Sequence, residues 1–408
     1  MQEWKTYTLK DLSKGKGEYG IGASAIPFDK DKLIYLRITD INDDGTLNKS
    51  GLTSVDAVDA SKYLLEKNDI VFARTGNSTG RSYFYDGSDG PLVYAGFLIR
   101  FRLDDSKFNP RILKYYSHSK PYYDWVQSFD TGGTRGNINA KTYGDMPITL
   151  PPRHVQDRIV DILYSLDAKI ENNRRINDNL EQQAQALYKS WFVDFEPFRE
   201  GEFIESKLGL IPSTWRTSSL LKMINVMSGG TPKTNEDKYW NGEIPFFTPK
   251  DNDSSIYCHS TEKYITELGL NKCNSLLYPK DTIFVTARGT VGKICLSGTA
   301  MAMNQSCYAI VANDSSQQLF WYYTISNLIR VIKNKANGAV FDAITVKDFD
   351  EVIVIPDNPT INSFVQRVSA MFESINNNLL ENINLAKQRD SILPKLMSGE
   401  LKINEIDC

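Results

Sequence analysis

The chain has 408 residues, which is enough for two domains plus connecting elements. Charged residues at 24% and aromatic residues at 11% are ordinary for a globular protein, and no apolar run approaches the ~20 residues of a membrane span. The formal net charge is −3, which argues against a chain that binds nucleic acid tightly by itself.

Cysteine usage and the first residues indicate a cytoplasmic protein with no membrane partner. Five cysteines fall almost wholly in the second half and lack metal-ligand spacing, a pattern typical of reduced thiols. The opening stretch MQEWKTYTLKDL has no apolar signal-peptide core. We expect no metal site.

The first 150 residues indicate an α/β unit of short strands. An apolar run at 70–73 predicts a strand that ends in the polar, glycine-bearing loop RTGNSTGR at 74–81. A second strand is expected over 96–102, a helix from Asn109, and an exposed loop, TGGTRGNI, at 131–138. With 20 Lys/Arg against 19 Asp/Glu, this unit is not strongly basic, which permits local basic loops but argues against tight binding of nucleic acid by the unit alone.

A helix of about ten turns is predicted after Pro151-Pro152, roughly 55 Å long at 1.5 Å per residue. Its apolar and amide residues recur at spacings of 3 and 4, which is the seam of a coiled coil. The seam residues are Leu163, Leu166, Ile170, Asn173, Asn177, Leu180, Ala184, Leu187 and Trp191.

Residues 201–356 repeat the pattern of the first unit. A strand at 283–286 ends in the loop RGTVGK at 288–293, and a second strand is expected over 307–311. A helix from Ser315-Ser316 precedes the exposed loop NGAVFDAI at 337–344. The charge is again balanced, because residues 201–360 carry 15 Lys/Arg against 16 Asp/Glu.

A second long helix is predicted after Pro356, with Pro394 expected to kink it or end it early. Asparagines lie in the middle of both seams, where an antiparallel pair of helices would bring them together and penalise other registers. The alternative is that each helix packs only on its preceding domain. The second seam comprises Val368, Met371, Ile375, Asn378, Asn382, Leu385, Arg389, Ile392 and Leu396.

The two halves of the chain are copies of one plan. Residues 151–192 align without a gap on 356–397, at an offset of 205, and 67–74 echoes 280–288. A repeat of that length indicates a domain duplication rather than a solenoid. Two similar units on one chain suggest two similar tasks.

Catalytic motifs are missing from the sequence. RGTVGK superficially matches a P-loop, but Ala287 and Ile294 stand where that motif needs glycine and Ser/Thr. The three histidines lack a carboxylate or cysteine at ligand spacing, and neither a methyltransferase tetrapeptide nor an adenosyl-cofactor fingerprint occurs. We therefore expect a protein without an active site or cofactor of its own.

The chain resembles, over essentially its whole length, the specificity subunit of type I restriction–modification enzymes. The second unit carries the resemblance best, whereas the first lacks GGTPKT and PFFTPKD segments and has diverged loops. Its tail, ITLPPRHVQDRIVDIL, is nevertheless similar to the family's entry into the central helix. The segments of the second unit are SKLGLIPSTW, SGGTPKT, YWNGEIPFFTPKD, ARGTVGKI and MNQSCYAI.

That resemblance implies a division of labour with partner proteins. Two target-recognition domains would each read half of a split site in double-stranded DNA, and two paired helices would separate them. Methyltransferase subunits would dock and supply adenine methylation with S-adenosylmethionine, and an ATP-dependent restriction/translocase subunit would complete the complex. Partner subunits could then supply much of the grip on phosphates.

Residues expected to contact DNA follow from their chemistry and their position on polar loops, since Arg, Lys, Asn, Gln, Ser and Thr read base edges or bind phosphates. For the first unit they are Arg74, Asn77, Ser78, Arg81, Thr134, Arg135 and Asn137. For the second they are Lys233, Thr234, Lys250, Arg288, Thr290, Lys293, Asn304, Gln305, Asn337 and Phe341.

The sequence thus predicts an α/β (α+β) chain with two similar target-recognition domains and two long helices in an antiparallel coiled coil. The expected boundaries are 1–150 and 201–356 for the domains, and 151–200 and 357–408 for the helical spacers. The leading hypothesis is a non-catalytic DNA-specificity subunit. The alternative is a coiled-coil scaffold that presents two protein-binding modules.

Overall fold

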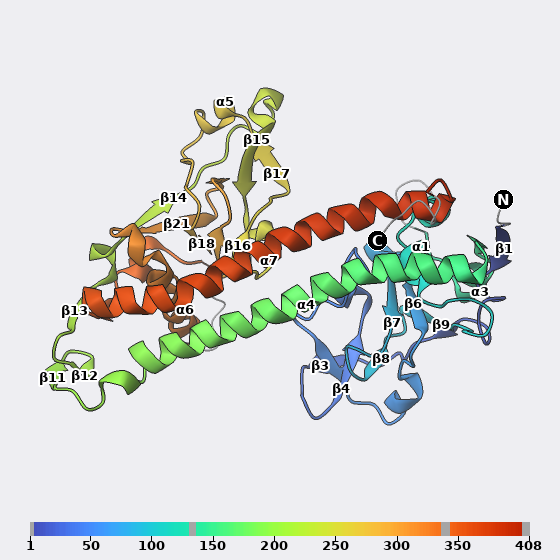
Figure 1. Cartoon of the computed structure of the whole chain (residues 1–408), viewed down its shortest axis with the longest axis horizontal. Coiled ribbons are helices and arrows are strands. Elements are labelled where there is room, and N and C mark those ends of the chain that lie inside the picture. The colour runs from blue at the N-terminus through green and yellow to red at the C-terminus, as the bar shows by residue number, and fades with distance from the viewer. Residues whose placement is uncertain (1–3, 130–135, 336–342, 402–408) are drawn as a thin grey trace. The chain divides into compact units, whose positions relative to one another are not determined.

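The computed structural model describes residues 4–129, 136–335 and 343–401. The chain divides into two compact units, one comprising residues 1–169 and 385–408 and the other residues 170–384. Both units take part of each long helix, α4 (Arg153–Phe192) and α7 (Asn358–Ser398), drawn in green and red in Figure 1. The predicted fold class, with two similar α/β units and two long helices, is confirmed.

Short strands build three sheets in the first unit. The order β2-β9-β6-β7 is antiparallel throughout, whereas the order β3-β5-β4-β8 contains one parallel pair, β4 with β8. β1 and β10 form a separate antiparallel pair. The strands are β1 (Lys5–Thr8), β2 (Glu18–Tyr19), β3 (Ala25–Pro27), β4 (Leu33–Leu36), β5 (Thr53–Val55), β6 (Asp69–Ala73), β7 (Ser82–Tyr85), β8 (Leu92–Tyr94), β9 (Leu98–Arg102) and β10 (Pro147–Leu150). The short helices are α1 (Ile112–Tyr116), α2 (Lys120–Gln127) and α3 (Ala140–Gly144).

The second unit has the same plan with additions. Its largest sheet has the order β14-β21-β18-β19-β16, the next has the order β17-β15-β20, and β13 pairs with β22. A hairpin, β11–β12, has no counterpart among the described elements of the first unit. The strands are β11 (Phe203–Ser206), β12 (Gly209–Pro212), β13 (Arg216–Ser219), β14 (Ile224–Ser228), β15 (Trp240–Phe247), β16 (Tyr257–Cys258), β17 (Lys263–Ile265), β18 (Ile283–Thr286), β19 (Ile294–Ser297), β20 (Ala302–Met303), β21 (Cys307–Ala312) and β22 (Val352–Ile355). The helices are α5 (Glu267–Leu270) and α6 (Gln318–Lys335).

Strand register relates the two units residue by residue. In the larger sheet of the second unit and its counterpart in the first, the last residue of β18 or β6 pairs with the first residue of β21 or β9. In the other sheet of each unit, two strands pair in parallel: β4 with β8, and β15 with β20. The matching pairs are Ala73–Leu98 and Leu36–Tyr94 in the first unit, and Thr286–Cys307 and Phe247–Met303 in the second. β6 and β18 are wholly buried, as expected for continuous apolar runs in central strands.

Both long helices contribute to the core of each unit. Leu163 of α4 and Leu396 of α7 are buried in the core of the first unit. Tyr188 of α4 and Phe372 of α7 are buried in the core of the second. The helices therefore pack both on each other and on the sheets. Within the described ranges, no helix is long and apolar enough to cross a membrane.

The ends of the helices depart from expectation at one point. α4 begins directly after Pro151-Pro152, where proline restricts the preceding backbone and favours a helix start. Pro394 lies inside α7, which continues to Ser398. The alternative that Pro394 ends the helix is therefore wrong, and the alternative that it kinks the helix stays a prediction. A proline removes the hydrogen bond to the carbonyl four residues earlier and its ring crowds that carbonyl. Burial of Leu393, Leu396 and Met397 in the core of the first unit favours the helical last turn nevertheless.

Candidate nucleic-acid interface

Two glycine-bearing loops leave corresponding ends of β6 and β18. In the first loop, Gly76 and Gly80 have φ of 71° and 87°, and in the second, Gly289 and Gly292 have φ of 79° and 72°. These left-handed conformations favour glycine, which explains the spacing of glycine in both loops. The loops share a frame, because the amide of the second glycine bonds to the last strand residue in both cases.

Packing behind the two loops is also equivalent. A Cβ added at Gly80 would lie 2.7 Å from the side chain of Val126 on α2. A Cβ at Gly292 would lie 2.4 Å from Lys333 on α6. Both glycines therefore let a helix approach the loop closely, which fixes the loop on its sheet.

The registers correct one correspondence drawn from the sequence. Arg74 follows β6 and donates its amide to Phe97, just as Ala287 follows β18 and donates its amide to Ser306. Arg74 therefore corresponds to Ala287, and Arg288 corresponds to Thr75. The two arginines looked equivalent in the sequence because each precedes the first glycine of its loop, but Arg74 is the first residue after its strand and Arg288 is the second.

The last residue of each loop, Arg81 or Lys293, binds groups of its own unit. Arg81 donates to the carbonyl of Ile41 at 3.1 Å and forms an ion pair with Asp43 at 2.6 Å. The corresponding Lys293 donates to the carbonyl of Asn252 at 2.8 Å. Each cation thus ties the loop to a short turn in the neighbouring sheet.

Those turns are equivalent despite different sequences. In η1 (Ile38–Asp40), Asp40 accepts from the amide of Arg37 at 2.9 Å. In η7 (Pro249–Asp251), Asp251 accepts from the amide of Thr248 at 2.7 Å. The first unit thus has a structural counterpart of the TPKD turn, although its sequence had given no sign of one. The backbone and one capping carboxylate preserve the turn, while the other side chains differ.

In the second unit, Lys250, Arg288 and Thr290 are exposed, and Lys293 is half-buried. The hydroxyl of Thr290 donates to the carbonyl of Pro249 at 3.4 Å, which joins the RGTVGK loop to the TPKD turn. The pKa of Lys333 is lowered mainly by burial and to a smaller extent by the nearby positive charge of Lys293. These contacts gather positive charge on two loops in a unit whose total charge is balanced.

A third segment of the second unit meets the same region. A Cβ on Gly229 would lie 2.2 Å from the carbonyl oxygen of Asn304, so only glycine permits this approach. Thr231 then donates a hydrogen bond to the side chain of Gln305. Asn304 uses its own side-chain oxygen to accept from Ser306 at 3.0 Å, whereas Gln305 is exposed.

Other predicted DNA-contacting residues differ in accessibility. Asn77 and Asn137 are exposed, as are Lys233 and Thr234, whereas Ser78 is 9% exposed. Burial leaves Ser78 poorly placed for direct contact with a ligand. Thr134, Arg135, Asn337 and Phe341 lie outside the described residues.

Sequence reasoning did not single out two aromatic residues beside Arg74. Tyr19, the last residue of β2, and Phe97, immediately before β9, place their ring centres 5.3 and 5.8 Å from the Arg74 guanidinium carbon. No motif marks these residues. They meet because β2, β9 and β6 are neighbours in one sheet.

The long helices pair through amides in the second unit. Asn173 donates to Asn382 at 2.9 Å, and Asn378 donates to Asn177 at 2.8 Å. Residue numbers rise along one helix as they fall along the other, so the helices are antiparallel. All predicted seam positions from Leu163 to Leu187 and from Met371 to Ile392 are buried or half-buried.

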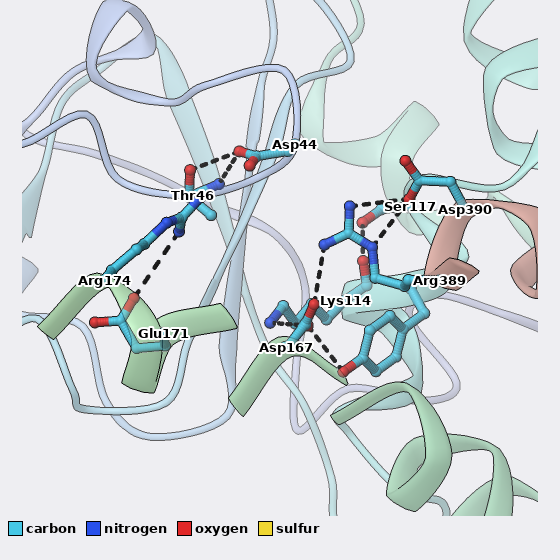
Figure 2. A network of polar contacts seen from close by, with 10 residues as sticks. Asp44, Thr46, Lys114, Ser117, Asp167, Glu171, Arg174, Arg389 and Asp390 are labelled. Atoms are coloured by element: carbon cyan, nitrogen blue, oxygen red, sulfur yellow. Dashed lines mark hydrogen bonds and ion pairs between the residues drawn. The ribbon is translucent and has the colours of Figure 1, made fainter. Parts of the chain in front are cut away.

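In the first unit an ionic network joins both helices to α1 (Figure 2). Asp167 of α4 accepts from Lys114 at 2.7 Å, from the Tyr115 hydroxyl at 3.0 Å and from Arg389 of α7 at 2.9 Å. Burial alone would raise the pKa of Asp167, but the two cations outweigh burial and lower it. Arg389 also contacts the exposed Asp390 at 2.9 Å. This network fixes the orientation of α1 on the helix pair.

Potential metal ligands do not cluster in the described residues. No group of three or more His, Cys, Asp or Glu side chains there could hold a metal ion. Burial raises the pKa of Cys258 to about 12 and that of Cys295 well above its ordinary value, so both remain protonated thiols at neutral pH. Their environment suits packing.

Comparisons with known proteins agree on one family. The model of the type I restriction modification DNA specificity domain matches residues 1–182 and 212–385. The HindI specificity subunit of Haemophilus influenzae is 23% identical over 98% of this chain and 100% of its own length. The MjaIX specificity subunit of Methanocaldococcus jannaschii is 29% identical over 72% of this chain and 69% of its own. The crystal structure of a type I restriction–modification S subunit from M. genitalium is similar in fold, with a TM-score of 0.56 and 16% identity over 97% of this chain and 96% of that one.

Proposed function

Because the chain belongs to the type I restriction–modification DNA specificity family, we propose that it selects the DNA sequence on which a type I complex acts. Its relatives are specificity subunits, which are not catalytic, so methylation and cleavage are the work of other subunits. The site is therefore a surface that reads DNA rather than an active site.

One observation carries the proposal: equivalent loops on equivalent frames present different side chains. The chain at Arg74-Thr75 in the first unit corresponds to Ala287-Arg288 in the second, although the flanking strand registers match. Direct readout depends on which donors and acceptors reach the base edges. A duplicated frame with unlike loops suits a protein that reads two different sequences.

The finer assignment is a split, asymmetric DNA site. Residues 1–150 form one target-recognition domain and residues 201–356 the other, with 151–200 and 357–408 as helical spacers. Each domain reads one half-site through the loops described above, and the base pairs between the half-sites are not read.

Partners complete the activity. Methyltransferase subunits that hold S-adenosylmethionine dock on this chain, as does an ATP-dependent restriction subunit. The balanced charge of each unit supports this arrangement, because non-specific affinity rises mainly with the number of phosphates neutralised. An adenine must also leave the helix to be methylated, which requires a pocket on the methyltransferase.

A domain exchange tests the modular assignment. Replacing residues 205–356 with the corresponding segment of a relative should change one half of the methylated motif, as read by methylation sequencing in a host that lacks adenine methylation. The unmodified chain with the same methyltransferase is the control. A change in both halves would contradict the assignment of one domain to one half-site.

Binding measurements test the dependence on partners and the scaffold alternative together. The chain alone should bind a duplex carrying the motif poorly, and adding the methyltransferase subunit should produce tight, sequence-specific binding. Tight specific binding by the chain alone would refute the partner requirement. If the methyltransferase binds but no DNA preference appears at any salt concentration, the protein-binding scaffold is the better description.

The helix pair provides a further test. We propose that α4 and α7 set the number of unread base pairs. Inserting one heptad into each helix should change that number while the bases read remain the same. Methylation at the original spacing would show that the helices do not set it.

A further inference from the structure

We infer that Tyr19, Arg74 and Phe97 form a rigid base-reading element in the first recognition domain, in which Arg74 donates to the O6 and N7 acceptors of a guanine. This inference rests on the proposed function and names residues that carry part of it. No motif in the sequence marks this aromatic pair.

Three neighbouring strands bring the element together. Tyr19 ends β2, Phe97 directly precedes β9, and Arg74 directly follows β6, in a sheet of order β2-β9-β6-β7. The amide of Arg74 donates to the carbonyl of Phe97 at 3.1 Å, and the amide of Ala140 donates to the Tyr19 hydroxyl at 3.1 Å. The backbone therefore holds all three residues at one end of the sheet.

A close backbone approach positions Tyr19. A Cβ at Gly20 would lie 2.3 Å from the carbonyl oxygens of both Tyr94 and Ala95, so only glycine fits there. Gly229 makes the same approach in the second unit, against Met303 and Asn304. Gly20 is therefore part of the shared frame, whereas the aromatic residue before it is not.

The element is peculiar to the first unit. The positions that correspond to Tyr19, Arg74 and Phe97 are Ser228, Ala287 and Ser306, as the register of β14, β21 and β18 requires. Three small residues thus replace two rings and a cation on the same frame. A difference of this kind is expected at a position that selects bases, and it is not needed to hold the sheet.

Arg74 is set apart from the other arginines around it. Arg37, Arg81 and Arg100 each have a carboxylate partner. Across residues 4–129 and the other described ranges, no carboxylate pairs with the Arg74 guanidinium, and its buried Nε has no hydrogen-bond acceptor. Its Nε is shielded from solvent, which leaves the terminal nitrogens as the donors available to a ligand.

The aromatic rings keep this cation ready to bind. A guanidinium held against two aromatic rings loses less conformational entropy when it forms hydrogen bonds, because its movement is already restricted. Tyr19 and Phe97 are 45% and 54% exposed, so the rings also offer apolar surface at the same place. An oriented fork of two N–H donors matches the paired acceptors of guanine, which is the commonest base-specific contact of arginine.

The test uses the full chain assembled with the methyltransferase subunit from the same source. Methylation sequencing first defines the motif, and the exchange of residues 205–356 identifies which half the first domain reads. Duplexes are then made in which each guanine of that half-site is replaced, one at a time, by 7-deazaguanine, which lacks the N7 acceptor. Affinity is measured for the unmodified chain and for Arg74→Lys, Arg74→Ala and Phe97→Ala.

The unmodified complex should lose affinity at one 7-deazaguanine position. Arg74→Lys, which keeps the charge but not the fork, should bind the natural site roughly 5- to 150-fold more weakly and no longer respond to that position. Phe97→Ala should give a smaller loss at the same position. Phe28→Ala, which removes a ring of the same 54% exposure, and Arg111→Ala, which removes a guanidinium 4.4 Å from the ring of Tyr164, should leave the response unchanged.

Several results would overturn the inference. The arginine variants could remain sensitive to every 7-deazaguanine, or the half-site could contain no guanine that matters. Equal weakening on unrelated DNA, with a shallower salt dependence, would make Arg74 a phosphate contact. Thermal unfolding equal to that of the unmodified chain excludes misfolding as the cause, since Arg74→Lys alters only the end of the side chain. If the unmodified complex showed no preference for either half-site, the proposed function itself would fail.

Discussion

Replacing Asp167 by asparagine should weaken the first unit by about 2–4 kcal/mol. The carboxylate is 13% exposed and is bound by Lys114 at 2.7 Å and by Arg389 at 2.9 Å. Removing one member of a buried ionic group typically costs about 3–5 kcal/mol, because the remaining charges stay desolvated without a partner. Lys114 and Arg389 are 33% and 20% exposed, and water compensates part of that loss.

The pH dependence of this contribution has a defined sign. The pKa of Asp167 is lowered in the folded chain, where the two cations outweigh the effect of burial. A carboxylate with a lowered folded pKa stabilises the fold above its unfolded pKa of about 3.9. The stabilisation is lost as the pH falls through the folded pKa, and Asp167→Asn should remove that acid-dependent part.

Hydrogen exchange measured by mass spectrometry reports on this unit separately from the other. Peptides that cover α1 and residues 385–398 should exchange faster in Asp167→Asn, while peptides from residues 201–356 should be unaffected. Asp390→Asn is the matched control, because Asp390 binds the same arginine but is 64% exposed, and its loss should cost less than about 1 kcal/mol. Equal effects of the two substitutions would refute the idea that burial makes Asp167 the important partner.

Three further outcomes follow from named contacts. Burial lowers the pKa of His118 to about 4, so between pH 6.5 and 4 the unfolded chain binds more protons than the folded chain. The free energy of unfolding should therefore fall by about 2 kcal/mol from pH 7 to pH 5, and His118→Gln should reduce that pH dependence in urea titrations. Asn177→Leu leaves the amide of Asn378 without its partner and should lower the free energy of unfolding by about 1–3 kcal/mol, whereas changing both to leucine should restore stability or increase it. Gly229→Ala would place a Cβ 2.2 Å from the carbonyl oxygen of Asn304, so this variant should lower the melting temperature of the second unit. An unchanged unfolding transition in calorimetry would contradict the close approach of the two backbones.

Periodicity made the helices predictable. The 3-and-4 spacing from Leu163 to Trp191 defines a narrow apolar stripe, and such a stripe is stable only when it faces another helix. Asparagines at matching seam positions identified the antiparallel direction, because an amide in an apolar seam needs a partner. The structure brings Asn173 to Asn382 and Asn177 to Asn378.

Loop positions were predictable, but loop contacts were not. Glycines at residues 76, 80, 289 and 292 mark backbone turns that side chains would strain, so both loops could be located from the sequence. The identity of Arg74 and Arg288 in the two loops suggested an equivalence that strand register does not support. Arg74 directly follows its strand whereas Arg288 is the second residue after its strand, and the strand register that shows this difference is not visible in the sequence.

The sequence by itself determined the duplication, the paired helices, the polar loops and the family, because each rests on a pattern between near neighbours or on a repeat of the chain. Only the tertiary structure decided which side chains contact one another. It joins Arg81 to Asp43, Asp167 to Arg389, and Arg74 to Tyr19 and Phe97. Those partners lie far apart along the chain, and they meet through strand order and helix packing, which depend on the burial of the whole core rather than on any local pattern.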